Sequence, residues 1–141
     1  MEPYIHKVQY YETDKMGITH HANYIRWMEE ARIDLLEKIG WGYDKMEAMG
    51  ISSPVIGIDC EYKASTTFGD LVEIRASLKE YKGVHLVVSY EMYRMSDGKL
   101  ALRGESRHCF MGTNGKFLRL GKEFPELDAA LKMLTEKKEL E

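Results

Sequence analysis

A carboxylate, two histidines and an asparagine gather shortly before an expected helix, in the segment 14–24 (DKMGITHHANY). Asp14 stands in a polar loop, and His21 and Asn23 stand where the helix is expected to begin. The unpaired N–H groups and the positive end of the helix dipole make a helix start a site for negative charge, including the oxyanion that develops when a carbonyl is attacked. A neighbouring carboxylate could then attack that carbonyl or activate water.

Each of these residues also has an ordinary structural interpretation. An Asp in a polar loop is most often a turn or capping residue, because its side chain readily accepts bonds from local N–H groups. Thr19 or Asn23 could be a simple helix cap, and the adjacent His20 and His21 do not have a metal-ligand spacing such as HExxH. From the residues alone, the structural interpretations are the better supported ones.

Composition and missing motifs exclude several other classes of function. The 141 residues are 44% hydrophobic with a net charge of −3 and interspersed charges, which gives no footprint for nucleic acid or an anionic membrane. No GxGxxG, GxxxxGK[ST], GxSxG or CxxC motif occurs. Cys60 and Cys109 are expected to be reduced thiols, and no apolar run reaches the ~20 residues of a membrane span. We expect one domain, residues 1–141, in a soluble cytoplasmic protein.

The hydrophobic periodicity predicts an α+β protein. We expect a strand over residues 5–11, a long amphipathic helix over 22–39 ended by Gly40, and one or two helical turns over 43–49. Period-two runs then predict strands over residues 55–62, 71–81, 85–95 and 100–112, a short helix over 125–135, and a charged end, 136–141, that frays. The helix must bury its apolar stripe against one face of this antiparallel sheet.

The chain resembles the hot-dog-fold thioesterases of the 4-hydroxybenzoyl-CoA thioesterase type, in particular the bacterial branch associated with the Tol–Pal cluster (YbgC-like). The resemblance covers most of the chain and is most specific in its first third. The residues that carry it are Tyr11-Glu12-Thr13-Asp14, Gly17, His21-Ala22-Asn23-Tyr24, Glu30-Ala31-Arg32, Tyr62-Lys63-Ala64 and Phe68-Gly69-Asp70-Leu71. Ser65 and Gly121 stand where family members commonly carry Pro, and neither position has a catalytic role.

The resemblance implies a hot-dog fold, with an antiparallel sheet wrapped around the long helix and sheets joined edge to edge in a homodimer or homotetramer. It implies hydrolysis of a short- or medium-chain or aromatic acyl-CoA without metal or organic cofactor, with Asp14 as nucleophile or general base. The N–H of His21 would polarise the thioester carbonyl, and the His21 side chain would bind the thioester or orient Asp14. Tyr24, Asn23 and Gly17 would contact the substrate, and candidates for the CoA phosphates are Lys63, Arg103, Arg107 and Lys116.

Two other functions fit the same sequence. An acyl-carrier-protein thioesterase would use the same site but needs a basic docking surface, of which this mildly acidic chain shows no concentration. A non-catalytic acyl-binding or scaffold protein would keep the fold, but it would not need Asp14. The sequence is compatible with more than one acyl chain length and with Asp14 as either nucleophile or general base.

Overall fold

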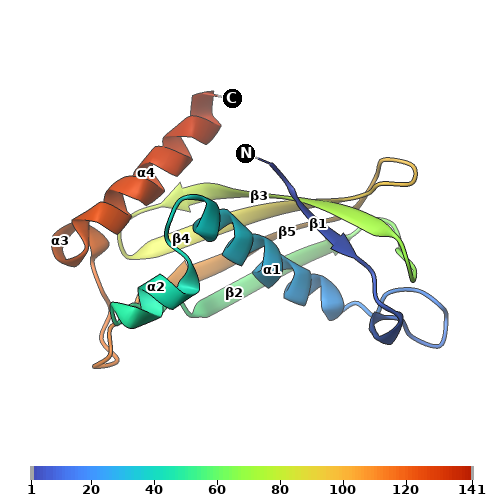
Figure 1. Ribbon diagram of the computed structural model, residues 1–141, viewed down its shortest axis with the longest axis horizontal. Helices are drawn as coiled ribbons and strands as arrows, with labels where there is room; N and C mark the ends of the chain where they lie inside the picture. Colours follow the sequence, from blue (N-terminus) through green and yellow to red (C-terminus); the bar gives the residue numbers. More distant parts are fainter. Residues whose placement is uncertain (1, 141) are drawn as a thin grey trace.

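The computed structural model describes residues 2–140, with side chains for residues 2–136. Five antiparallel strands form one sheet in the order β1-β3-β4-β5-β2. Helix α1 lies across one face of this sheet (Figure 1). The elements in chain order are β1 (Tyr4–Lys7), the 3-10 turn η1 (Tyr10–Glu12), α1 (Asn23–Lys38), α2 (Tyr43–Ala48), β2 (Val55–Tyr62), β3 (Leu71–Tyr81), β4 (His85–Arg94), β5 (Lys99–Cys109), α3 (Leu120–Glu123) and α4 (Pro125–Leu140).

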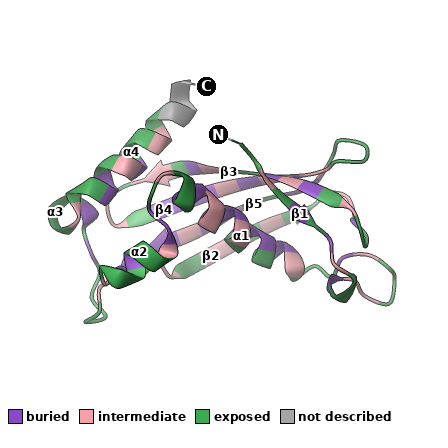
Figure 2. Cartoon of the chain, viewed as in Figure 1, coloured by how far each residue is buried: buried purple, intermediate pink, exposed green. Residues whose placement is uncertain are grey.

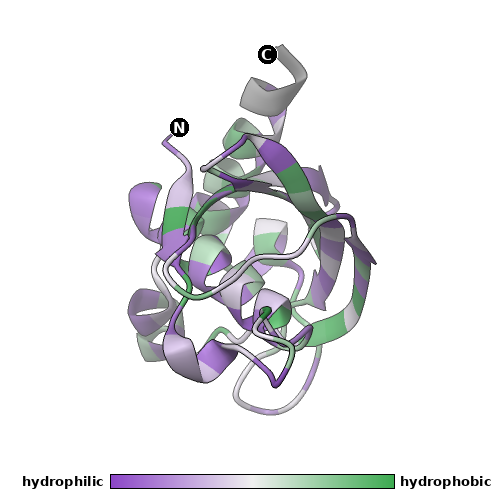
Figure 3. Cartoon of the chain, turned by 90° about the vertical axis from the view of Figure 1, so that its right-hand side faces the viewer, coloured by the Kyte–Doolittle hydropathy of each residue, from purple (hydrophilic) through white to green (hydrophobic). Residues whose placement is uncertain are grey.

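Helix α1 is the element around which the sheet curves (Figure 3). Its buried residues recur at helical spacing and face the strands, whereas its other side is exposed (Figure 2). They are Tyr24, Trp27, Met28, Ala31, Arg32, Leu35 and Leu36. These side chains join buried residues of β3, β4 and β5 in one core. The predicted α+β arrangement, a sheet around a long helix, is therefore confirmed.

Strands β2 and β3 and the extent of α1 agree closely with the sequence prediction, whereas the first strand is shorter than predicted. It ends at Lys7 because the chain turns into η1, where the Glu12 side chain accepts the Gln9 N–H at 2.8 Å. The final strand ends at Cys109, the short helix α3 was not predicted, and α4 is helical to Leu140 rather than ending near residue 135. Helix α4 thus includes most of the charged end, whose fraying stays a prediction, and Glu141 lies outside the described residues.

Within residues 2–140, no helix combines the length and apolar character needed to cross a membrane.

Candidate functional site

The loop between η1 and α1 reverses the direction of the chain (Figure 1), and Asp14 is part of it. Thr13 and Thr19 face each other in an isolated antiparallel bridge, and the Asp14 N–H donates to the Ile18 carbonyl at 2.9 Å. Gly17 has φ +78°, a conformation that glycine adopts without steric cost, and its N–H donates back to the Asp14 carbonyl at 2.9 Å. Gly17 is thus placed to form the turn that holds Asp14.

The Asp14 carboxylate is partly buried, and only one of its two oxygens accepts a hydrogen bond from the described residues. Its Oδ1 accepts the N–H of Met16 at 2.8 Å, which is the local turn that an Asp in a polar loop typically makes. Among the described residues, no donor is placed on Oδ2. The structural interpretation of Asp14 is therefore correct for one oxygen, and the other oxygen accepts no hydrogen bond from the described residues.

A buried threonine anchors the loop to the segment before β3. The Thr19 N–H donates to the Thr66 carbonyl at 2.8 Å, and the two hydroxyl oxygens lie 2.6 Å apart. Thr66 is 1% exposed, and its hydroxyl also lies 2.9 Å from the Tyr24 hydroxyl. Tyr24, expected to contact substrate, is itself buried in this chain at 3% exposure. Thr66 belongs to none of the sequence motifs. Its role is recognised only from its contacts with Thr19 and Tyr24, which are distant in the sequence.

The first turn of α1 is capped differently from the expectation. Neither Thr19 nor Asn23 caps the helix: Ala22 is the cap residue, and the Asn23 side chain donates to the Glu12 carbonyl at 2.9 Å and to the His20 carbonyl at 3.3 Å. Asn23 therefore closes the loop rather than satisfying the helix. Across residues 2–140, the backbone N–H groups of His21 and Tyr24 have no acceptor. Unpaired donors at a helix start are suited to bind a developing oxyanion.

The His21 side chain points to the surface beside another strand. Its ring stacks on His20 with centroids 4.3 Å apart and meets the Tyr62 ring edge-on at 6.4 Å. The Tyr62 hydroxyl, from the end of β2, donates to the His21 carbonyl at 3.1 Å. In the described part of the chain, no hydrogen bond joins the His21 ring to Asp14.

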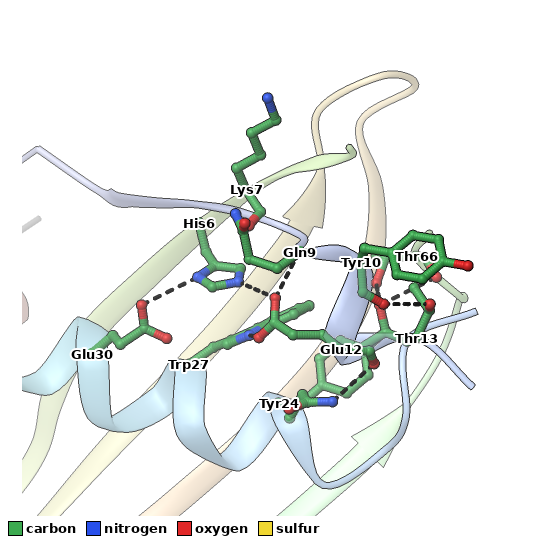
Figure 4. Close-up of polar contacts among 12 residues, drawn as sticks. His6, Lys7, Gln9, Tyr10, Glu12, Thr13, Tyr24, Trp27, Glu30 and Thr66 are labelled. Carbon is green, nitrogen blue, oxygen red and sulfur yellow. Dashed lines mark hydrogen bonds and ion pairs between the residues drawn. The ribbon is translucent and has the colours of Figure 1, made fainter. Parts of the chain in front are cut away.

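Behind the loop lies a polar cluster of the buried residues Glu12, His6 and Trp27, with the partly exposed Glu30 at its edge (Figure 4). Glu12 is 4% exposed, and its carboxylate accepts bonds from the Gln9 N–H at 2.8 Å, His6 at 2.8 Å and the Trp27 indole at 2.6 Å. Burial opposes ionisation of Glu12, but these donors outweigh it and hold the pKa of the carboxyl below its usual value. Glu12 and Glu30 belong to the family pattern, which predicts no role for them, and His6 is not part of that pattern.

The four cations expected to bind CoA phosphates do not gather in one place. Arg107 pairs with Asp59 at 2.6 Å, Lys63 with Glu61 at 3.1 Å. Lys63 follows Tyr62, and Arg103 pairs with Glu61 in the sheet register, so both belong to the His21 end. Lys116 follows the opposite end of β5, roughly 20 Å away at ~3.3 Å per strand residue.

Two cavities of the chain lie away from this end of α1. A cavity of about 620 Å³ opens near the helix C-terminus, lined among others by Leu35, Lys38 and Leu134. A smaller one, of about 240 Å³, lies between α2 and the chain before β2. Neither cavity is lined by Asp14 or His21. No cluster of three or more His, Cys, Asp or Glu side chains among the described residues is suited to hold a metal ion.

Comparison with known families decides between the classes of protein that this geometry allows. The model of the Thioesterase-like superfamily matches residues 8–133. The chain belongs to this superfamily. It is therefore, as expected from its motifs, a member of a family of thioester hydrolases, and the predicted hot-dog class is confirmed.

Similar proteins support the assignment over nearly the full length. A Bacillus subtilis protein named "Putative acyl-CoA thioesterase YneP" is 35% identical over 88% of this chain and 90% of its own length. A DHNA-CoA thioesterase from Staphylococcus aureus has a solved structure that is 31% identical, covers 98% of this chain and 93% of its own, and superposes with a TM-score of 0.92. The acyl-CoA thioesterase YbgC of Helicobacter pylori is 28% identical over 67% of this chain and 68% of its own length.

Proposed function

We propose that this protein hydrolyses acyl-CoA thioesters at the Asp14 loop and the start of α1. The observation that carries the proposal is the pairing of a carboxylate with one free oxygen, Asp14 Oδ2, and a helix start whose His21 N–H has no acceptor in the described chain. The relatives named acyl-CoA thioesterase share the superfamily and most of the sequence length. These facts support a thioester substrate in particular, because a thioester is already activated towards attack and needs no triad.

The proposed reaction uses few groups. The Met16 N–H fixes Asp14 Oδ1, which orients Oδ2 to attack the thioester carbonyl or to take a proton from an attacking water. In the base route, Asp14 takes a proton from water, the hydroxide adds to the carbonyl, the C–S bond breaks, and the CoA thiolate takes that proton as the free acid is released. In the nucleophilic route, breaking the C–S bond releases the CoA thiolate and leaves a mixed anhydride between Asp14 and the acyl group, which water then cleaves to restore Asp14 and release the free acid. The His21 N–H would stabilise the negative charge on the carbonyl oxygen in the transition state, a contribution of about 10²–10³ in rate for one such donor.

The CoA site is proposed to be completed by a second copy of the chain. Strand β2 is an edge of the sheet, and its residues Val55, Ile56 and Tyr62 are 46%, 58% and 48% exposed. Exposed apolar edge strands are ready to pair with another strand. A two-fold antiparallel pairing of β2 with its copy would bring the far end of one sheet beside the His21 end of the other. Lys116 of the partner subunit would then approach Lys63 and Arg103 near the CoA phosphates.

Thiol release is the direct test. Acetyl-, butyryl-, hexanoyl-, palmitoyl- and benzoyl-CoA would be offered to the native protein, to Asp14→Asn and to Asp70→Asn. The first variant keeps an acceptor for the Met16 N–H and removes the reactive carboxylate. Asp70 is a matched control, because it is also a partly buried loop Asp that accepts one backbone N–H, that of Thr67 at 2.9 Å.

We expect turnover of at least one substrate by the native protein, a fall of at least about 100-fold in Asp14→Asn, and native turnover in Asp70→Asn. Full activity in Asp14→Asn would reject the site. No turnover of any CoA ester would reject this substrate class, and the same panel on acyl carrier protein would then show whether a carrier-bound thioester replaces it.

A further inference from the structure

Glu12 is the residue at which both ends of the Asp14 loop meet. Its carbonyl oxygen accepts the N–H of His20 at 2.8 Å and the side-chain N–H of Asn23 at 2.9 Å. The loop that carries Asp14 thus leaves from Glu12 and is closed on the same residue, immediately before the free His21 N–H. Any shift of Glu12 would move both partners of the proposed reaction.

The Glu12 side chain is held as firmly as its carbonyl. Its Oε1 accepts the Gln9 N–H and a bond from His6, and its Oε2 accepts the Trp27 indole at 2.6 Å (Figure 4). Trp27 stands one helical turn after Asn23, so side chain and carbonyl of Glu12 bind the same face of α1. The carboxylate is 4% exposed, and no substrate reaches it.

His6 supports Glu12 from the sheet side. Its Nε2 lies 2.8 Å from Glu12 Oε1, and its Nδ1 lies 3.2 Å from Glu30 Oε1, which also accepts the Tyr4 hydroxyl at 2.8 Å. Its ring packs on Trp27 with centroids 4.4 Å apart. Strand β1, turn η1 and helix α1 therefore meet at a single buried carboxylate.

We propose that Glu12, supported by His6, is the positioning residue of this enzyme: it fixes Asp14 and the His21 N–H relative to each other without touching the substrate. This inference rests on the proposed function. Its physical reason is that displacing a catalytic group by about 1 Å costs on the order of 10²-fold in rate. Position, rather than the negative charge of Glu12, is what the site requires.

Two conservative variants separate position from charge. Glu12→Gln keeps the length of the side chain, and its one amide oxygen can still accept the Gln9 N–H and a bond from His6. Its NH2 group then faces the Trp27 indole, so the bond to Trp27 and the charge are both lost. Glu12→Asp keeps the charge and shortens the side chain by one methylene, so it cannot reach Trp27 and His6 from the same backbone position. Asp128→Glu is the matched control, since Asp128 is a buried carboxylate at 8% exposure that binds Tyr81 and Lys132 far from the loop.

We expect Glu12→Asp to lower kcat by roughly 10- to 100-fold with little change in KM, because the proposed CoA contacts lie on other elements. Glu12→Gln, which loses the bond to Trp27 but keeps those to Gln9 and His6, should lower kcat less than Glu12→Asp does, and Asp128→Glu should retain it fully. The opposite ranking, with Gln inactive and Asp active, would show that the charge matters and would overturn the proposal.

Amide hydrogen exchange over residues 12–24 gives a second readout that needs no substrate. Exchange should be faster in Glu12→Asp than in the native protein, intermediate in Glu12→Gln and unchanged in Asp128→Glu, because the shortened side chain moves the carbonyl that binds the His20 N–H furthest. Should the native protein cleave no thioester, the proposed function fails while this measurement still decides the positioning role. Native exchange in Glu12→Asp would overturn it.

Discussion

At the scale of single residues, the core holds a charged side chain without a carboxylate partner among the described residues. Arg32 is 6% exposed and donates to the hydroxyls of Tyr43 at 2.8 Å and Tyr90 at 3.0 Å. Because Arg32 can only donate, the Tyr90 hydrogen is directed to Ser106 at 2.6 Å, and that of Ser106 to Nε2 of His108 at 2.8 Å. The chain of bonds therefore requires His108 to be neutral.

This network predicts acid sensitivity. Burial, with a smaller effect of the Arg32 charge, lowers the pKa of His108 to about 4, whereas an unfolded His titrates near ~6.5. The unfolded state therefore binds the extra proton between these values, and stability falls as the pH drops from about 6.5 to about 4, by up to about 3 kcal/mol. Glu12, whose pKa is also lowered, adds to this loss at still lower pH.

Urea unfolding at pH 7 and pH 5 measures the effect. The free energy of unfolding of the native protein should fall between the two, and His108→Gln, which does not titrate, should show a smaller fall. Equal falls in both proteins would contradict the assignment of the acid sensitivity to His108.

Among the secondary-structure elements, the end of α1 shows how a single glycine determines where a helix stops. Gly40 has φ +83°, its N–H donates to the Glu37 carbonyl at 3.0 Å, and the Trp41 N–H donates to Leu36 at 2.9 Å. This is the Schellman pattern, which satisfies the last carbonyls of a helix. The prediction that Gly40 ends the helix is confirmed.

Replacing Gly40 should therefore cost stability without affecting the site. A Cβ at Gly40 meets nothing within 4 Å, so the penalty of Gly40→Ala is purely conformational, about 1 kcal/mol. Gly121→Ala is the control, because Gly121 does not have a positive φ. Thermal unfolding should show a lower Tm for Gly40→Ala alone, with kcat unchanged in both variants. An unchanged Tm in Gly40→Ala would reject this account of the helix end.

Local patterns predicted the elements well, and long-range contacts explain what they missed. The apolar stripe of α1 and the alternation of side chains in β2 and β3 depend on residues that are close together in the sequence. Both were therefore predictable. The first strand was predicted too long because a side-chain bond between Glu12 and Gln9 overrides the alternation there. Thr66 binds Thr19 across a separation of 47 residues, which no local pattern reveals. Asp14 and His21 came from the family motif rather than from periodicity.

For the molecule as a whole, the exposed edge of β2 and the separated cations can both be explained by the pairing of two chains. A single chain places Lys63 and Arg103 near His21, but Lys116 lies at the far end of the sheet. In a two-fold symmetric pairing of two β2 edges the two chains run in opposite directions. Lys116 of the partner subunit would then lie near Lys63 and Arg103. The same pairing covers apolar edge residues that would otherwise face water.

A charge on this edge should separate the copies and weaken the enzyme. Ile56→Lys introduces a cation at a residue of β2 that is 58% exposed, and Met133→Lys makes the same change at a residue of α4 that is 59% exposed. Light scattering after size-exclusion chromatography should give a dimer or tetramer for the native protein and Met133→Lys, and a monomer for Ile56→Lys. Turnover of acyl-CoA should fall at least about tenfold only in Ile56→Lys, since each ~1.4 kcal/mol of lost binding is a factor of ten. A native monomer with full turnover would show that one chain suffices, and the CoA phosphates would then have to be bound by Lys63 and Arg103 of that same chain.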